Sequence, residues 1–359
     1  MERLLLTTGG TGGHIFPALA VAEALRREFP QARILFAGSD YGPEARLAAA
    51  AGLDFVGLPV RGLVGRGIRA AGAAARMLPA TGRALAIVRR FRPQVVAGFG
   101  GYAAFAPMLA GRCLGVPCVL HEQNAIPGVS NRLLARLAQR ICLSLPGAEG
   151  FPREKCVLTG NPVRAAVAAV GERSRDFSGR RLLIMGGSLG AHALNVHIPE
   201  HLARLRAAGV EIRHQTGTAD EAAVRAAYAA AGYDPACVTA FIDDMAAAYA
   251  WADLALCRAG ATSVAELCAA GVPSILVPFP FAAHDHQTRN AEALRDAGAA
   301  LHVAQEDMES ADIVGLALEL LDDPLRRAAM SDAARRHARP DAAERVLREI
   351  RAVCGELEQ

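Results

Sequence analysis

Several features of common protein classes are missing from this 359-residue chain. No run of about 18 apolar residues is free of charges and of Gly and Pro clusters, so the sequence predicts no membrane-spanning helix. The start carries an acidic residue and passes at once into a glycine-rich loop, without the longer apolar core of a signal peptide. We therefore expect the protein to stay in the cytosol.

Metal-binding patterns are also scarce. The eight cysteines include no C-x-x-C pair and mostly lie in apolar segments, which indicates reduced core residues rather than a disulfide framework or a zinc site. No D-x-D motif is present to hold Mg²⁺ or Mn²⁺ against a sugar diphosphate. His284-Asp285-His286 has two histidines but no further ligand cluster. The sequence predicts no metal site and no obligatory metal cofactor.

The charges are unevenly distributed along the chain. Residues 1–160 hold 19 Arg and Lys against 9 Asp and Glu, a balance of +10, and the remainder has a balance of −7. Aromatic residues make up only 5%, which gives nucleic acid no stacking partners and argues against that ligand. The basic half is expected to face a phosphate-bearing ligand or lipid headgroups.

One arginine-rich segment, residues 61–92, contains no acidic residue and interleaves apolar side chains. This pattern predicts an amphipathic surface for anionic lipid rather than an ordinary solvated helix, which would mix in acids. Each arginine near such a lipid contributes about 1 kcal/mol. The arginines singled out for membrane contact are Arg66, Arg69, Arg76 and Arg83.

Short apolar runs alternate with Ala-rich amphipathic segments, a pattern typical of a parallel sheet wrapped by helices. It restarts after Asn161-Pro162, which predicts two doubly wound α/β domains: residues 1–160, completed by a C-terminal helix at about 341–355, and residues 164–338. The predicted strands are 4–8, 34–37, 95–98, 118–121 and 141–143, then 182–185, 212–215, 238–241, 254–257, 274–277 and 301–303. Ligands should bind at the carboxyl ends of both sheets, in a cleft between the domains.

Three glycine loops follow predicted strands, at residues 9–14, 98–102 and 186–191. In the first, Pro17 is expected to open a helix whose N-terminus would attract phosphate. The loop lacks the third glycine of a dinucleotide fingerprint, which argues against a dehydrogenase, although Asp40 lies where a ribose-binding acid would. The third loop has the features of a diphosphate site.

Glu266 has two interpretations. Ser263-x-x-Glu266 fits a capping box, in which Glu266 would cap its own helix. Alternatively, its carboxylate accepts hydrogen bonds from ribose hydroxyls, the usual task of an acid at this edge of a nucleotide-binding sheet. Spacing alone leaves both open.

Seven short sequence blocks, taken in order along the chain, resemble those of the MurG family of peptidoglycan N-acetylglucosaminyltransferases. The similarity runs from Leu4 to the 340–342 segment. The matching blocks are residues 9–14, 98–102, 121–124, 160–164, 186–190, 241–245 and 285–290. The resemblance implies a GT-B fold, two Rossmann-like domains facing a central cleft. It also implies transfer of N-acetylglucosamine from UDP-N-acetylglucosamine to the C4 hydroxyl of the muramoyl sugar of lipid I, with inversion to a β-1,4 linkage, giving lipid II.

The resemblance further implies peripheral attachment to the cytoplasmic face of the plasma membrane, and a role in cell shape and division. It leaves room for other cell-wall synthesis proteins as partners. Gly100 and Gly101 are expected beside the acceptor diphosphate. The donor contacts that the resemblance implies are Thr11, Gly12, Gly13, Asn124, Arg164, Ser188, Ile242, Ala261, Thr262, Ser263, Val264, Ala265, Glu266 and Gln287.

An inverting transfer needs a base for the acceptor proton. His14 is the first candidate because the helix N-terminus beside it disfavours a protonated ring. Glu122 is the second, and an alternative role for His14 is to bind phosphate or fix its loop. A UDP-N-acetylglucosamine 2-epimerase and a non-catalytic UDP-sugar-binding module remain competing interpretations of the whole chain.

Overall fold

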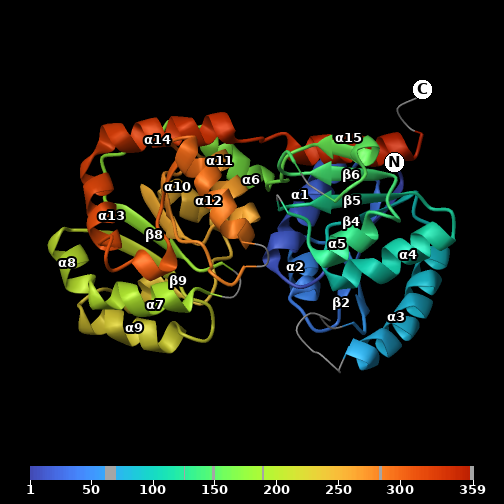
Figure 1. The fold of residues 1–359 in the computed structure, drawn as a ribbon, viewed down its shortest axis with the longest axis horizontal. Coiled ribbons are helices and arrows are strands. Elements are labelled where there is room, and N and C mark those ends of the chain that lie inside the picture. The colour runs from blue at the N-terminus through green and yellow to red at the C-terminus, as the bar shows by residue number, and fades with distance from the viewer. Residues whose placement is uncertain (61–69, 125, 148–149, 188–189, 283–284, 356–359) are drawn as a thin grey trace. The chain divides into compact units, whose positions relative to one another are not determined.

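A computed structural model describes residues 1–60, 70–124, 126–147, 150–187, 190–282 and 285–355, with the backbone alone described at 70–77 (Figure 1). Its internal contacts divide the chain into two compact units. The first comprises Met1–Arg164 and Arg339–Gln359, and the second comprises Ala165–Ala338. The chain thus returns to the first unit after completing the second.

The first unit contains a seven-stranded parallel sheet in the order β3-β2-β1-β4-β5-β6-β7. The order reverses between β1 and β4, which is the topological switch point of a doubly wound fold. The strands are β1 (Arg3–Thr7), β2 (Arg33–Ser39), β3 (Asp54–Leu58), β4 (Val95–Gly98), β5 (Cys118–Glu122), β6 (Arg140–Leu143) and β7 (Cys156–Leu158). The helices are α1 (Gly12–Glu28), α2 (Glu44–Ala50), α3 (Ala70–Phe91), η2 (Tyr102–Ala104), α4 (Phe105–Cys113), α5 (Val129–Leu134), η3 (Arg153–Lys155) and α15 (Ala342–Val353).

Helices cover both faces of this sheet because successive side chains of a strand point to opposite sides. Leu4 and Leu6 of β1 pack in a core with α1, α2 and α15, whereas Leu5 packs in a second core with α3, α4 and α5. All three leucines are fully buried. The continuous apolar run of β1 therefore follows from burial on both faces.

The last helix, α15, belongs to the first unit. Its apolar stripe of Val346, Leu347 and Ile350 is buried in the same core as α1. Ion pairs flank that stripe, with Glu344 Oε1 3.1 Å from Arg27 Nη1. These exposed pairs contribute little, so the apolar stripe, at about 1.5–3 kcal/mol for each large side chain, holds the helix in place.

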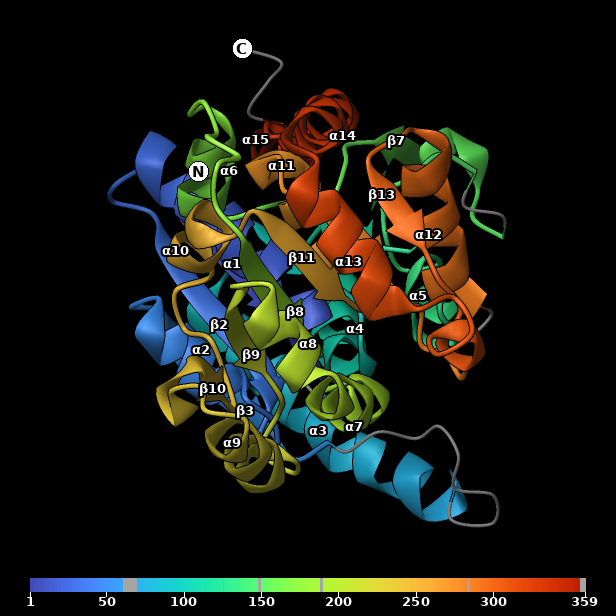
Figure 2. The ribbon, with the colours of Figure 1, turned by 90° about the vertical axis from the view of Figure 1, so that its left-hand side faces the viewer.

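The second unit contains a six-stranded parallel sheet in the order β10-β9-β8-β11-β12-β13 (Figure 2). Its switch point lies between β8 and β11. The strands are β8 (Arg181–Met185), β9 (Glu211–Gln215), β10 (Val238–Thr239), β11 (Leu254–Cys257), β12 (Ser274–Leu276) and β13 (Ala300–His302). The helices are α6 (Ala165–Gly171), α7 (His192–Glu200), α8 (Leu202–Ala207), α9 (Glu221–Ala230), η4 (Pro235–Cys237), α10 (Met245–Trp251), α11 (Ala261–Ala270), α12 (His286–Asp296), η6 (Gln305–Asp307), α13 (Ile313–Asp322) and α14 (Pro324–His337).

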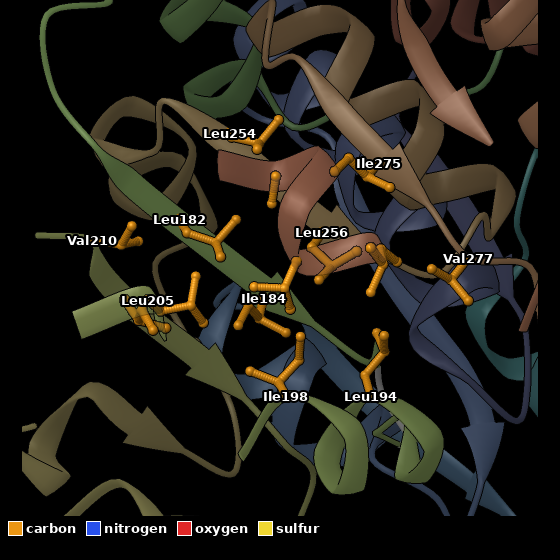
Figure 3. Packing of buried hydrophobic residues seen from close by; sticks show 14 of the residues in the cluster. Leu182, Ile184, Leu194, Ile198, Leu205, Val210, Leu254, Leu256, Ile275 and Val277 are labelled. Atoms are coloured by element: carbon orange, nitrogen blue, oxygen red, sulfur yellow. The ribbon is translucent and has the colours of Figure 1, made fainter. Parts of the chain in front are cut away.

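Figure 3 shows the core on one face of the second sheet. Ile184 of the central strand β8 and Leu256 of the neighbouring β11 meet Leu194 and Ile198 of α7, and all four side chains are fully buried. This packing holds the N-terminal part of α7 against the end of β8.

Three details differ from the sequence predictions. The edge strands β3 and β7 were not predicted: β3 begins with exposed Asp54 and contains Gly57, which interrupt its apolar run, and β7 has only three residues, all half-buried. The strand predicted at 238–241 ends at Thr239. Pro17 does not open a helix: α1 begins at Gly12 and contains Pro17, since glycine tolerates the turn that starts the helix earlier.

Candidate active site

The first unit brings two glycine loops together at the carboxyl edge of its sheet. The loop after β1 bonds to the loop after β4, with Gly9 N 3.3 Å from Gly100 O. Gly101 has a φ of 78°, and a Cβ there would overlap the carbonyl oxygen of Gly9. Only glycine allows this approach. The predicted donor residues Thr11, Gly12 and Gly13 follow directly, with Thr11 as the N-cap of α1.

Glu44, the first residue of α2, supports this loop from below. It is fully buried, and its Oε1 accepts a hydrogen bond of 3.0 Å from Gly10 N. Side chains at Gly38 and Gly42 would collide with the Glu44 side chain, so these glycines make room for it. This hydrogen bond from the Gly10 amide to a buried carboxyl oxygen fixes the loop that precedes His14. The sequence analysis missed this residue.

His14 lies in a chain of hydrogen bonds whose direction can be assigned. Gln123 Nε2 donates to Phe99 O at 2.9 Å, so the amide oxygen of Gln123 must face His14. That oxygen, Oε1, is 2.9 Å from His14 Nδ1, which must therefore carry the proton. In the tautomer so defined, the lone pair of the imidazole is on Nε2.

His121 anchors the other end of this chain. Its Nδ1 accepts from Gln123 Nε2 at 3.1 Å, and its Nε2 donates to the carbonyl of Gly160 at 3.1 Å. Burial lowers the pKa of His121 to about 4, with a smaller contribution from nearby His14. Near pH 7 His121 is therefore neutral and keeps the Gln123 amide in one orientation, which in turn fixes the tautomer of His14.

Glu122, the second candidate base, is 1% exposed and has both oxygens engaged. Oε1 accepts from the backbone N of Asn124 at 2.9 Å and from Asn124 Nδ2 at 3.2 Å, and Oε2 accepts from Asn131 Nδ2 at 2.8 Å. The carboxylate thus orients Asn124, a predicted donor residue, at the end of β5. Its geometry is that of a positioning residue.

Arg164 lies in the first unit, although the sequence analysis grouped it with the second domain. Its guanidinium Cζ is 4.4 Å from the centre of the Phe16 ring on α1. This cation–π contact places the charge beside the helix that carries His14. The difference arises because strand β7, which the pattern did not reveal, extends the first sheet almost to this residue.

The second unit presents its own loop at the switch point between β8 and β11. Ser188 of this loop lies outside the described residues. Gln215 lies at the end of β9, is 5% exposed and holds the two glycines that precede Ser188. Its Oε1 accepts from Gly186 N at 3.2 Å, and its Nε2 donates to Gly187 O at 3.0 Å. The same Nε2 donates to Ala240 O at 3.0 Å. One buried amide therefore joins two loops that follow different strands.

Helix α11 begins at Ala261 with Gly260 as its N-cap, so the capping-box interpretation of Ser263 and Glu266 is wrong. Glu266 is buried on the second turn, where its Oε2 accepts a hydrogen bond of 3.2 Å from Tyr249 Oη. A glycine cap provides no side-chain acceptor for the helix N-terminus, which is a favourable place for an anion. Thr262 is buried, and Ala261, Ser263, Val264 and Ala265 are half-buried.

Two further predicted residues follow strands at the same edge of this sheet. Half-buried Ile242 is in the segment between β10 and α10. Gln287, on the first turn of α12, accepts a hydrogen bond of 3.0 Å at Oε1 from the backbone N of Phe279. Parallel strands place their carboxyl ends at one edge, so the loops after β8, β10, β11 and β12 gather there.

Of the arginines predicted for membrane contact, Arg66 and Arg69 and the side chain of Arg76 lie outside the described residues. Arg83 on α3 is half-exposed, and its Nη1 is 3.8 Å from Asp40 Oδ2. Asp40 is the residue whose position after the second strand is also compatible with ribose binding in a dehydrogenase. In this structure it has a cationic partner, Arg83. No helix of the described part of the chain is long and apolar enough to cross a bilayer.

Comparison with known proteins identifies one family domain in each of the two units. Residues 4–143 match the glycosyltransferase family 28 N-terminal domain, and residues 181–346 match the glycosyltransferase family 28 C-terminal domain. A protein from Nitratidesulfovibrio vulgaris strain Miyazaki F, named UDP-N-acetylglucosamine--N-acetylmuramyl-(pentapeptide) pyrophosphoryl-undecaprenol N-acetylglucosamine transferase, is 58% identical over 93% of this chain and 92% of its own. The chain belongs to the MurG family of glycosyltransferases. A protein of the same name from Solidesulfovibrio magneticus is 51% identical over 98% of both chains.

Solved structures agree with this assignment. The crystal structure of Acinetobacter baumannii MurG is 36% identical, has a TM-score of 0.73 and covers 98% of this chain and all of that one, which confirms the GT-B fold. A putative UDP-N-acetylglucosamine 2-epimerase from Listeria monocytogenes has a TM-score of 0.71 at 15% identity, with 98% and 97% of the two chains covered. That likeness shows a shared fold alone.

Proposed function

We propose that this enzyme transfers N-acetylglucosamine from UDP-N-acetylglucosamine to the C4 hydroxyl of the muramoyl sugar of lipid I, giving β-1,4-linked lipid II and UDP. The names of relatives at 45–58% identity support the substrates. The observation that carries the chemistry is the His14–Gln123 hydrogen bond, because it holds a proton on Nδ1 and so leaves Nε2 as the nitrogen that can accept the proton of the acceptor hydroxyl.

The reaction is a single displacement with inversion. As the acceptor oxygen bonds to C1 of the sugar, the bond from C1 to the β-phosphate oxygen breaks and UDP leaves with the electron pair. The acceptor proton passes to His14 Nε2. Glu122 is the weaker candidate for this task, because both of its oxygens already accept hydrogen bonds from Asn124 and Asn131.

For the donor, we place the diphosphate at the Ser188 loop and the N-terminus of α11, the ribose at Glu266 and the uracil beside Ile242. Asn124 and Gln287 would contact the sugar. The assignment of Glu266 to the ribose is supported by two observations: its carboxylate is oriented by Tyr249, and it does not cap its own helix. The negative charge of the leaving UDP would be met by backbone amides and helix dipoles, without an obligatory metal.

The acceptor diphosphate would lie at the loops around Gly12, Gly100 and Gly101, and α3 would hold the enzyme on anionic lipid at the cytoplasmic face of the membrane. On this helix Ala80, Ala84 and Val88 are buried at a spacing of four residues. Leu78 is 77% exposed, and Arg83, Arg89 and Arg90 are exposed as well. One face thus packs on the core, while apolar and cationic side chains remain for the bilayer.

The reaction is tested by measuring UDP release from UDP-N-acetylglucosamine with and without a short-chain lipid I analogue, using UDP-N-acetylgalactosamine as the control donor. Release that requires the acceptor and the gluco donor supports the proposal. Acceptor-independent conversion of the donor would instead identify an epimerase, and UDP binding without release would identify a binding module.

The membrane assignment is tested by sedimentation with vesicles. Binding to vesicles that contain phosphatidylglycerol should weaken in Leu78→Glu and Arg83→Glu, and rising salt should release the protein, since the attraction is screened. Equal binding to neutral and anionic vesicles would contradict a role for the arginines.

A further inference from the structure

Two histidines and a glutamate of the second unit form a cluster that the proposed transfer does not use. His197 lies on α7, His201 follows the last residue of α7, and Glu309 lies between η6 and α13. One ligand atom of each side chain lies within 4.8 Å of the others, and within the described ranges this is the one group of three such side chains. The sequence analysis, which predicted no metal site, overlooked the His-x-x-x-His spacing.

The distances suit a small ion with short bonds. Glu309 Oε2 is 3.6 Å from His197 Nδ1 and also 3.6 Å from His201 Nε2. In a tetrahedral zinc site with bonds of about 2.0–2.1 Å, neighbouring ligand atoms lie about 3.3–3.4 Å apart. Shifts of a few tenths of an ångström would bring the Glu309 oxygen to this spacing from each nitrogen, and the two nitrogens lie within 4.8 Å of one another. The two imidazole rings are neighbours, with centroids 4.7 Å apart and planes tilted by 50°.

The surroundings of the cluster also favour a cation. His201 Nε2 is buried and has no hydrogen-bond partner among the described residues. The carboxylates of Glu200, Glu309 and Asp312 interact electrostatically with His197, and Arg204 Nη1 lies 2.6 Å from Asp312 Oδ1.

We propose that His197, His201 and Glu309 bind a zinc ion, with water in the fourth position. Two imidazoles and one carboxylate are a donor set typical of zinc, whereas Mg²⁺ and Ca²⁺ prefer oxygen alone. The ion fastens the junction of α7 and α8 to the segment that leads into α13, beside the Arg204–Asp312 ion pair. This site stands independently of the glycosyl transfer.

The test uses the full chain, stripped with a chelator and titrated with zinc chloride by calorimetry. We expect one zinc ion per chain. His197→Ala and His201→Ala should each weaken binding by about 100-fold, and Glu309→Gln by about tenfold. His192→Ala is the matched control: it removes a histidine from the same helix whose ring pairs instead with Asp220, at 3.0 Å, and it should bind zinc as the unaltered protein does.

The proposal is overturned if the double variant His197→Ala/His201→Ala still binds one zinc ion with unchanged affinity, or if the unaltered chain binds none. Glu309 is 78% exposed, so Glu309→Gln tests the site even where a histidine variant fails to fold. Cobalt substitution identifies the ligands: a thiolate-to-cobalt charge-transfer band would assign the ion to one of the eight cysteines and refute the site.

Discussion

Gln123 offers a sharp test of the reasoning about His14. The side chain is 2% exposed, accepts the proton of His14 Nδ1 and donates to Phe99 O and His121 Nδ1. Gln123→Met preserves the volume and removes all three hydrogen bonds. His14 then loses the partner that holds its proton on Nδ1, and a fraction of the rings presents N–H where a lone pair is needed.

The size of the effect can be bounded. A general base contributes about 10²–10⁴-fold to rate, and loss of a group that only positions it should cost about 10- to 100-fold in kcat, equivalent to about 1.4–2.8 kcal/mol. The KM for UDP-N-acetylglucosamine should change little. Phe99 O and His121 Nδ1 lose their hydrogen-bond donor, which should lower the unfolding free energy by about 1–3 kcal/mol for each. The folded fraction must therefore be checked by thermal melting.

Turnover is measured as acceptor-dependent UDP release. Because Gln123 acts through His14, the double variant His14→Ala/Gln123→Met should be no slower than His14→Ala alone. Gln94→Met is the matched control, since its amide accepts from the backbone of Glu2 and Arg3 at the opposite edge of the sheet. Normal kcat in Gln123→Met, or full additivity in the double variant, would refute the tautomer argument.

Three other outcomes follow from the structure. Glu44→Ala should lower the unfolding free energy of the first unit by about 1–3 kcal/mol, because Gly10 N loses its acceptor, and Glu44→Gln by less; urea titration measures both. Gln215→Leu should weaken UDP binding by about tenfold in calorimetry while leaving binding of a lipid I analogue unchanged, since only the loops of the second unit lose their brace. Burial lowers the pKa of His121 to about 4 and that of His214 to about 3, so as pH falls below about 6.5 these histidines are protonated in the unfolded chain before they are in the folded one. The unfolding free energy of each unit should therefore fall by about 2 kcal/mol between pH 7 and pH 5. A constant urea midpoint over that range would contradict this.

The fold could be predicted far more fully than the contacts within the site. Buried parallel strands have apolar runs bounded by glycine, and both sheets contain such runs at the positions where the sequence placed them. The edge strands β3 and β7 escaped because Asp54 and Gly57 interrupt the apolar run of the first and the second has only three half-buried residues. The position of Arg164 in the first unit was missed for the same reason.

By itself, the sequence determined that two doubly wound units carry glycine loops at the carboxyl ends of their strands, because period and turn chemistry are local properties. Tertiary structure decided which side chains from different loops meet. His14 and Gln123 are 109 positions apart, and Gly10 and Glu44 are 34 apart. A parallel sheet brings such loops to one edge, but the partner of each donor and acceptor depends on how the loops pack, which no local pattern encodes.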